Sequence, residues 1–99
     1  MDFKVILQPL ALDDLEAIVR HVAEKDVRAA NRLGMSLLDR AEALAQFPER
    51  GGNVRSRPGV KKLVRVPYLI FYRVDDARHC VDVLRFWHGA QNPRSLQLE

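Results

Sequence analysis

The residues that could take part in chemistry are concentrated between residues 60 and 90, where basic side chains are interleaved with aromatic ones. The basic or titratable members are Lys61, Lys62, Arg65, Arg73, Arg85 and His88. Arginines contact phosphates, and aromatic rings stack on nucleic-acid bases. The same residue types are the usual hot spots of protein–protein interfaces. The composition therefore indicates a binding surface for either nucleic acid or protein.

The charge of the chain is distributed unevenly. Its formal net charge of +3 combines −3 over residues 1–49, +7 over residues 50–74 and −1 over residues 75–99. The central segment holds seven Lys and Arg and no acidic residue. Such a block is expected where a protein binds phosphates or an acidic partner, and a solvated face of a basic protein would give the same pattern.

Residues for other chemistries are present but lack the required spacing. The three histidines are not placed as metal ligands, and no serine stands in a nucleophile motif. Gly51-Gly52 is not followed by the Lys-Ser or Lys-Thr of a phosphate-binding loop. The single cysteine, Cys80, excludes an internal disulfide and a cysteine-based zinc site. We therefore expect no metal and no cofactor.

Three runs rich in β-branched and aromatic residues predict a sheet: Val60–Val66, Tyr68–Val74 and Cys80–His88. The short links between the runs favour an antiparallel meander. Strict alternation predicts that one face of the second run holds Tyr68, Ile70, Tyr72 and Val74. In the third run it places Val81, Val83, Arg85 and Trp87 opposite Asp82, Leu84, Phe86 and His88. Both faces are apolar, so the sheet needs cover on both sides.

The first half of the chain predicts a strand and two helices. Residues 2–8 alternate as a strand, and a helix should run from Pro9 to about Glu24. A second helix should extend from Val27 to Gln46. The short link between the helices predicts an antiparallel hairpin that covers one face of the sheet.

Particular residues refine this helix hairpin. Asp26 is expected to cap the second helix, and Gly34 to allow close approach of the first. Asp13, Asp14 and Glu16 are expected at the N-terminal end of the first helix, where the helix dipole favours anions.

The length and the elements together indicate a single α+β domain over residues 1–99. The N-terminal segment is too short and too interrupted for a signal peptide, and no run reaches membrane-spanning length. We expect a cytoplasmic protein that does not enter a membrane. The tail, RSLQLE from Arg94, is expected to be mobile or to become ordered on a partner.

In this order and spacing, the elements resemble the RelE/ParE superfamily of type II toxin–antitoxin toxins. The resemblance covers nearly the whole chain. It rests on the junction of the first strand and the first helix, from Pro9 onward, and on four segments: LAQFPERGG, PGVKKL, YLIFYRV and VLRFWHGAQNP. It implies an N-terminal strand, a two-helix antiparallel hairpin and a three-stranded antiparallel meander. It also implies a cytoplasmic toxin that is neutralised by a cognate antitoxin. ParE-like members, of the plasmid stabilisation branch, poison DNA gyrase, and RelE-like members cleave messenger RNA on the ribosome.

Within this resemblance the residues favour the ParE-like branch. RelE-like enzymes typically carry an arginine after the tyrosine of the second meander strand, where this chain has Leu69. They often carry a tyrosine in the tail, where this chain has none and only Arg94 is basic. RNA cleavage needs a proton acceptor for the 2′-hydroxyl and positively charged side chains that stabilise the phosphorane-like transition state. A RelE-like catalytic set here would be Lys62, Arg65, Arg73, Arg85 and His88, with His88 the only obvious base.

The ParE-like interpretation implies a toxin that acts by binding DNA gyrase and performs no catalysis. Its target-binding residues would be Lys61, Lys62, Arg65, Arg73, Arg85 and His88. Two alternatives remain open at this point: a ribosome-dependent ribonuclease that acts on messenger RNA, and a non-toxic basic nucleic-acid-binding module.

The two apolar faces of the sheet carry a further expectation. One helix hairpin can cover only one face, so an apolar patch should stay exposed within the basic block. An acidic amphipathic segment of the antitoxin would fit such a patch. The expected antitoxin-binding residues are Tyr68, Phe71, Phe86 and Trp87.

Overall fold

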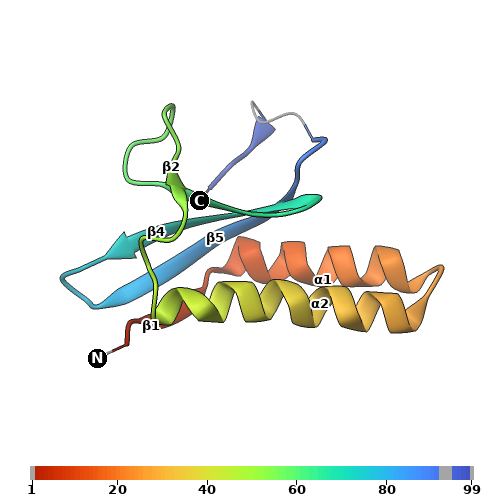
Figure 1. The fold of residues 1–99 in the computed structure, drawn as a ribbon. Coiled ribbons are helices and arrows are strands. Elements are labelled where there is room, and N and C mark those ends of the chain that lie inside the picture. The colour runs from red at the N-terminus through yellow and green to blue at the C-terminus, as the bar shows by residue number, and fades with distance from the viewer. Residues whose placement is uncertain (1, 92–94, 99) are drawn as a thin grey trace.

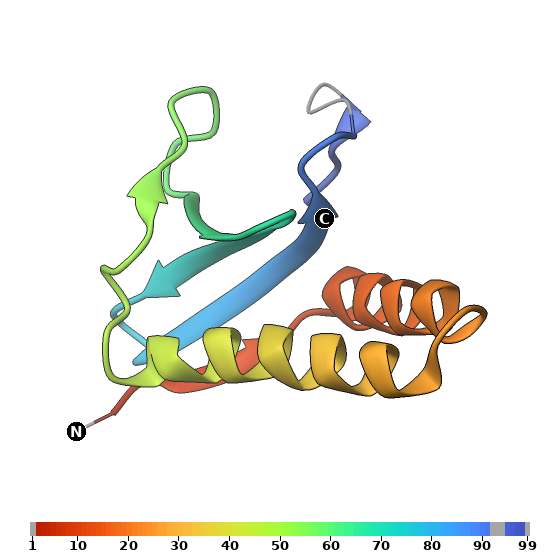
Figure 2. The same cartoon turned by 45° about the vertical axis from the view of Figure 1, so that its right-hand side comes forward.

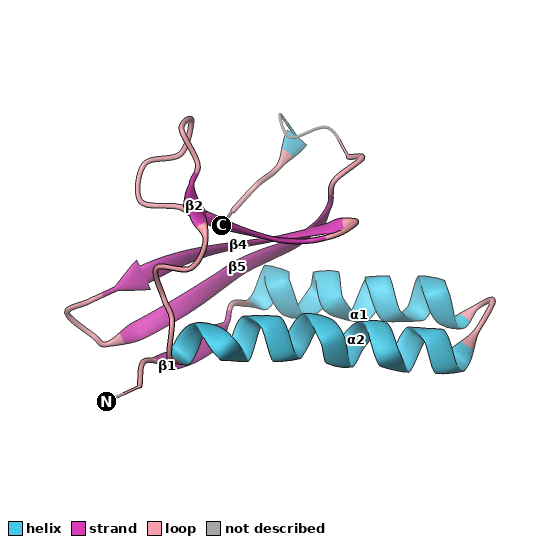
Figure 3. Cartoon of the chain, in the orientation of Figure 1, coloured by secondary structure: helices cyan, strands magenta, loops and turns pink. Residues whose placement is uncertain are grey.

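The computed structural model describes residues 2–91 and 95–98 and places the elements in the expected order with one strand added (Figures 1 and 3). The helical half consists of β1 (Lys4–Leu7), α1 (Pro9–Ala23), α2 (Val27–Glu42) and the 3₁₀ turn η1 (Ala43–Ala45). The second half consists of β2 (Gly52–Asn53), β3 (Lys61–Arg65), β4 (Tyr68–Asp75) and β5 (Cys80–His88).

All described strands form one mixed sheet in the order β1-β5-β4-β3-β2. The strands β3, β4 and β5 make the expected antiparallel meander. Strand β1 runs parallel to β5, from Lys4 opposite Cys80 to Leu7 opposite Val83. The two-residue β2, which was not anticipated, pairs with the start of β3. The α+β class is confirmed, with the meander extended by one strand on each side.

The helix hairpin forms for the predicted reasons. Pro9 stands at the start of α1, and the Asp26 carboxylate caps α2 by accepting a hydrogen bond from the Ala29 N–H at 3.0 Å. A Cβ at Gly34 would lie 3.0 Å from Val19 Cγ2, so glycine at this position lets α1 and α2 pack closely. The dipole explanation of the acidic residues is wrong, because the first turn of α1 contains none of them.

Both helices lie against one face of the sheet, which we call the helix face (Figures 1 and 2). The core on this face includes Leu37 and Leu44 from the helical half and Ile70, Tyr72 and Val83 from the strands, all without exposed surface. The Tyr72 hydroxyl accepts a hydrogen bond from the Gly51 N–H and donates one to the Pro48 carbonyl, each at 2.8 Å. Tyr72 thus fastens the segment that follows α2 to the sheet.

A β-bulge changes the faces predicted for β5. Phe71 stands opposite Arg85, and Tyr72 stands opposite Val83, so Leu84 is the extra residue. An extra residue reverses the alternation beyond it. Val83 and Phe86 therefore share the helix face, whereas Leu84 and Trp87 share the opposite face. The strict alternation expected for this strand holds up to Leu84 and was wrong from Arg85 onward.

The opposite face, which we call the tail face, is covered by the chain's own C-terminal segment and by the loop before β3 (Figure 2). Leu96 is 5% exposed and packs in one cluster with Val60, Phe71, Leu84 and Trp87. Val54, Leu69 and Leu98 pack around this cluster. The expected mobile tail is wrong for Ser95–Leu98, while Arg94 and Glu99 lie outside the described residues.

Candidate functional site

The structure does not bring the six expected target-binding residues together. Lys61 and Arg65 each stand two residues from Leu63 on β3, so they share its face of the sheet, and Leu63 belongs to the helix-face core. Arg65 Nε donates to Ser36 Oγ on α2 at 2.8 Å. Lys61 Nζ lies 2.8 Å from a Glu49 carboxylate oxygen, and the hydrogen bond to Glu49 raises the pKa of Lys61. These two basic residues thus contact α2 and the segment that follows η1.

Lys62 and Arg73 belong to the tail face. Lys62 is exposed and stands opposite Phe71, whose side chain lies in the tail-face cluster. Arg73 and Leu98 line two shallow depressions of about 300 and 360 Å³ beside the tail. Lys62 and Arg73 are therefore separated from Lys61 and Arg65 by the thickness of the sheet.

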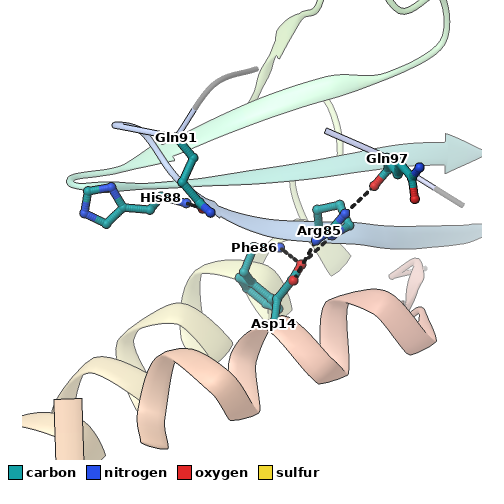
Figure 4. A network of polar contacts seen from close by, with 6 residues as sticks. All are labelled: Asp14, Arg85, Phe86, His88, Gln91 and Gln97. Atoms are coloured by element: carbon teal, nitrogen blue, oxygen red, sulfur yellow. Dashed lines mark hydrogen bonds and ion pairs between the residues drawn. The ribbon is translucent and has the colours of Figure 1, made fainter. Parts of the chain in front are cut away.

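Arg85 joins α1, the sheet and the tail (Figure 4). Its Nε and Nη2 donate to the two carboxylate oxygens of Asp14 at 2.6 and 2.8 Å. Its Nη1 donates to the main-chain carbonyl of Gln97, and its guanidinium carbon lies 5.3 Å from the centre of the Trp87 ring. The hydrogen bonds with Asp14 raise the pKa of Arg85. These contacts give Arg85 a structural role.

His88 lies on the helix side, away from the other basic candidates. It lines a groove together with Tyr68, and the two rings meet edge to face with centres 5.2 Å apart. His88 Nδ1 accepts a hydrogen bond from the Ala90 N–H at 3.0 Å, which assigns the proton of a neutral ring to Nε2. Among the described lining residues of this groove there is no lysine or arginine.

The four expected antitoxin-binding aromatics are divided between the two faces. Phe71 and Trp87 are 5% and 7% exposed beneath the tail, while Tyr68 and Phe86 belong to the helix-face core. The expected exposed aromatic patch is therefore wrong, because the tail completes the burial of its own face. Whether these residues bind an antitoxin stays a prediction.

Two important features were missed in the sequence. Leu96 and Leu98 stand two residues apart, which is an extended apolar pattern that could have indicated packing on the sheet. The pairing of Asp14 with Arg85 left no local signal, because 71 positions separate the two residues. Asp14 also accepts a hydrogen bond from the Phe86 N–H at 3.1 Å.

Two further findings bound the chemistry of the described residues. Within residues 2–91 and 95–98, no group of three or more His, Cys, Asp or Glu side chains is placed to hold a metal ion. None of the helices formed by these residues is long and apolar enough to cross a membrane.

Comparison with known proteins gives consistent matches. Residues 5–93 match the model of the family described as ParE toxin of type II toxin-antitoxin system, parDE. The chain is 37% identical over 82 residues to Toxin RelE2 of Caulobacter vibrioides, a match that covers 82% of this chain and 89% of the relative. It is 32% identical over 96 residues to Toxin RelE1 of the same organism, covering 92% and 98% of the two chains.

Solved structures share the fold. A chain of the toxin-antitoxin complex RelBE2 from Mycobacterium tuberculosis superposes with a TM-score of 0.70 at 25% identity, covering 89% of this chain and 99% of that one. A chain of the chromosomal ParDE system from P. aeruginosa superposes with a TM-score of 0.74 at 24% identity, covering 87% and 95%. The second likeness concerns the fold alone.

Proposed function

Because the chain belongs to the ParE toxin family of type II toxin–antitoxin systems, we propose that it inhibits DNA gyrase by binding it and that a cognate antitoxin neutralises it. One observation carries the choice of binding over catalysis. His88, the only obvious base of a RelE-like set, lines a groove whose described residues include no lysine or arginine. Cleavage of RNA requires positive charge beside the base to stabilise the developing phosphorane.

The remaining candidates support the same proposal. Arg85 is paired with Asp14, and Arg65 donates to Ser36. Lys62 stands on the other face of the sheet from Arg65. Basic side chains spread over an edge and two faces suit the binding of a large protein surface better than the gripping of one scissile phosphate.

A RelE-like ribosome-dependent ribonuclease is the second candidate. It is favoured by the names of the two Caulobacter relatives, RelE2 and RelE1, which match at 37% and 32% identity. The two candidates differ in the molecule that is damaged, and this makes them separable in one experiment.

The test is controlled expression followed by assays with purified protein. We expect growth arrest with DNA damage, gyrase trapped on DNA, and loss of supercoiling activity when the toxin is added to purified gyrase. Messages cut on the ribosome without DNA damage would replace this proposal by the ribonuclease. Unimpaired growth would contradict a toxic activity of this chain altogether.

A matched pair of variants tests the basic surface. Lys62→Glu reverses an exposed charge on the tail face, and Lys25→Glu reverses an exposed charge between the helices. We expect Lys62→Glu to raise the toxin concentration that inhibits gyrase about tenfold, and Lys25→Glu to change it little. Equal effects of the two variants would show that only net charge matters.

A further inference from the structure

A groove between α1 and the end of β5 is separate from the tail face. It has a volume of about 400 Å³, and we call it the α1–β5 groove. Its described lining residues are Asp14, Ala17, Ile18, His21, Tyr68, Phe86, His88 and Gln91. The four from α1 are spaced i, i+3, i+4 and i+7, so they form one stripe about 10 Å long on the helix surface. The groove therefore has a helical wall and a strand-end wall.

The floor of the groove is apolar. Phe86 is 2% exposed, and Ile18 packs against the same helix-face core. Tyr68 adds an aromatic ring whose hydroxyl forms no hydrogen bond within the described part of the chain. A partner that lay here would need an apolar side chain to fill the floor.

The polar rim offers hydrogen-bond donors, and its main acceptors are already used. The Asp14 carboxylate receives hydrogen bonds from Arg85 Nε and Nη2 and from the Phe86 N–H (Figure 4). Gln91 Oε1 accepts from the His88 N–H at 3.2 Å, which leaves the Gln91 amide NH₂ as a donor. His88 Nδ1 accepts from Ala90, which leaves its Nε2–H as a donor. An acceptor group on the ligand therefore matches the remaining donors of His88 and Gln91.

We propose that the α1–β5 groove binds an amphipathic segment of the cognate antitoxin, with an Asp or Glu carboxylate on the donors of His88 and Gln91 and an adjacent apolar side chain on Ile18 and Phe86. This inference rests on the proposed function in one respect, that an antitoxin neutralises the chain. A protein carboxylate suits the groove better than a nucleic-acid backbone, because a chain of phosphates requires lysines and arginines along its path.

The test uses a substitution that adds a carboxylate to the groove. Ala17 is exposed in the α1 stripe, and Ala17→Glu introduces a good helix former, so the fold is retained. Ala17→Gln has the same length without the charge. Asn31→Asp adds the same charge at an exposed position of α2, outside the groove. The probe is the neighbouring gene product that restores growth when it is expressed together with the toxin.

The readout is the dissociation constant of the complex between this gene product and each purified toxin variant. We expect Ala17→Glu to weaken binding on the order of tenfold or more through repulsion of the partner's carboxylate. Asn31→Asp should stay within about twofold of the unsubstituted chain. Ala17→Gln should be clearly less harmful than Ala17→Glu. His88→Phe, which keeps a ring against Tyr68 and removes the donor, should also weaken binding.

The outcomes separate this inference from the proposed function. If no neighbouring product restores growth or binds the unsubstituted chain, the proposed neutralisation fails. If the antitoxin binds and Ala17→Glu leaves its affinity unchanged, the antitoxin docks elsewhere and the groove proposal is overturned. Equal losses for Ala17→Gln and Ala17→Glu would overturn the carboxylate chemistry. If single-stranded DNA or RNA displaces the antitoxin from the unsubstituted chain but not from Ala17→Glu, the groove binds nucleic acid. If the chain dimerises and Ala17→Glu abolishes the dimer, the groove binds a second copy of the chain.

Discussion

The two faces of the sheet are buried to a similar degree by different kinds of structure. On the helix face, α1 and α2 cover Ile70 and Val83 completely. On the tail face, Leu96 and Leu98 cover the strands together with the loop residues Val54 and Val60. A short terminal segment can leave a sheet while the remaining core stays folded, whereas a central helix cannot. The two faces are therefore buried to a similar degree, but the cover of the tail face should detach at a lower free-energy cost than the cover of the helix face.

The tail is held at its main chain as well as through its leucines. Arg57 Nη2 donates to the Leu96 carbonyl at 2.7 Å, and Arg85 donates to the Gln97 carbonyl. Such hydrogen bonds do not depend on the identity of the tail side chains. Arg85 also contacts Asp14 on α1, so it is the point where the two differently covered faces are coupled. Four substitutions test this comparison.

The largest effect is expected in the helix-face core. Leu37→Ala removes a fully buried side chain between α2 and the sheet, and this should lower the free energy of unfolding by about 2–5 kcal/mol. Urea unfolding followed by circular dichroism measures the loss. Leu12→Ala, at a half-exposed position of α1, is the control and should change stability by less than about 0.5 kcal/mol. A small loss in Leu37→Ala would contradict the assignment of the main core to this face.

The second-largest loss of stability is expected when the pairing of Asp14 with Arg85, which couples the two faces, is broken. Asp14→Asn leaves the Arg85 guanidinium, in a half-buried position, without its carboxylate, and should lower the free energy of unfolding by about 2–3 kcal/mol. Trp87 emission should change as well, since Arg85 lies over its ring. Glu16→Gln breaks an exposed pair with Arg20 on the same helix and should have almost no effect. Equal effects of the two variants would remove the special role of Asp14.

Tyr72→Phe should have a moderate effect on the helix face. The Gly51 N–H and the Pro48 carbonyl would both lose their partner, which should lower the free energy of unfolding by about 1–3 kcal/mol. Tyr68→Phe is the control, because the Tyr68 hydroxyl has no hydrogen bond within the described residues. The same urea measurement at neutral pH compares them. A larger loss in Tyr68→Phe would contradict this assignment.

Tyr72 also has a pH signature. Burial raises its pKa above the ordinary value of 10.0, so the folded state keeps the phenol proton more tightly than the unfolded state. The associated stability is fully present below pH 10 and is lost as the pH rises through the folded pKa. Between pH 9 and 11 the unfolding midpoint should therefore fall more steeply in the unsubstituted chain than in Tyr72→Phe. If the midpoints of the two proteins fell in parallel with pH, the burial of the Tyr72 hydroxyl would be contradicted.

The smallest global effect is expected on the tail face. Leu96→Ala should lower the free energy of unfolding by only about 1 kcal/mol, because the tail can detach without disturbing the helix-face core. Its local effect should be clear: Trp87, the single tryptophan, should shift its emission to the red and become more accessible to acrylamide. Gln97→Ala, an exposed neighbour, should do neither. A cooperative loss as large as that of Leu37→Ala would show that the two faces unfold as one.

Local patterns in the sequence determined the elements of this protein. The apolar period of 3.6 predicted α1 and α2, Asp26 marked the cap between them, and the period of 2 predicted β3, β4 and β5 almost to the residue. These features depend on side chains that are neighbours along the chain, so a single sequence contains them. The fold class followed, because a helix hairpin and a meander have few ways to bury their apolar faces.

Only the tertiary structure decided which of those residues meet. The bulge at Leu84 placed Phe86 and Trp87 on faces opposite to those that alternation predicts. The C-terminal segment packs on the tail face, and Asp14 pairs with Arg85, from which it is separated by 71 positions in the sequence. Such contacts depend on register and on the close approach of distant segments. No local propensity contains that information, because each partner would have the same local conformation without the other.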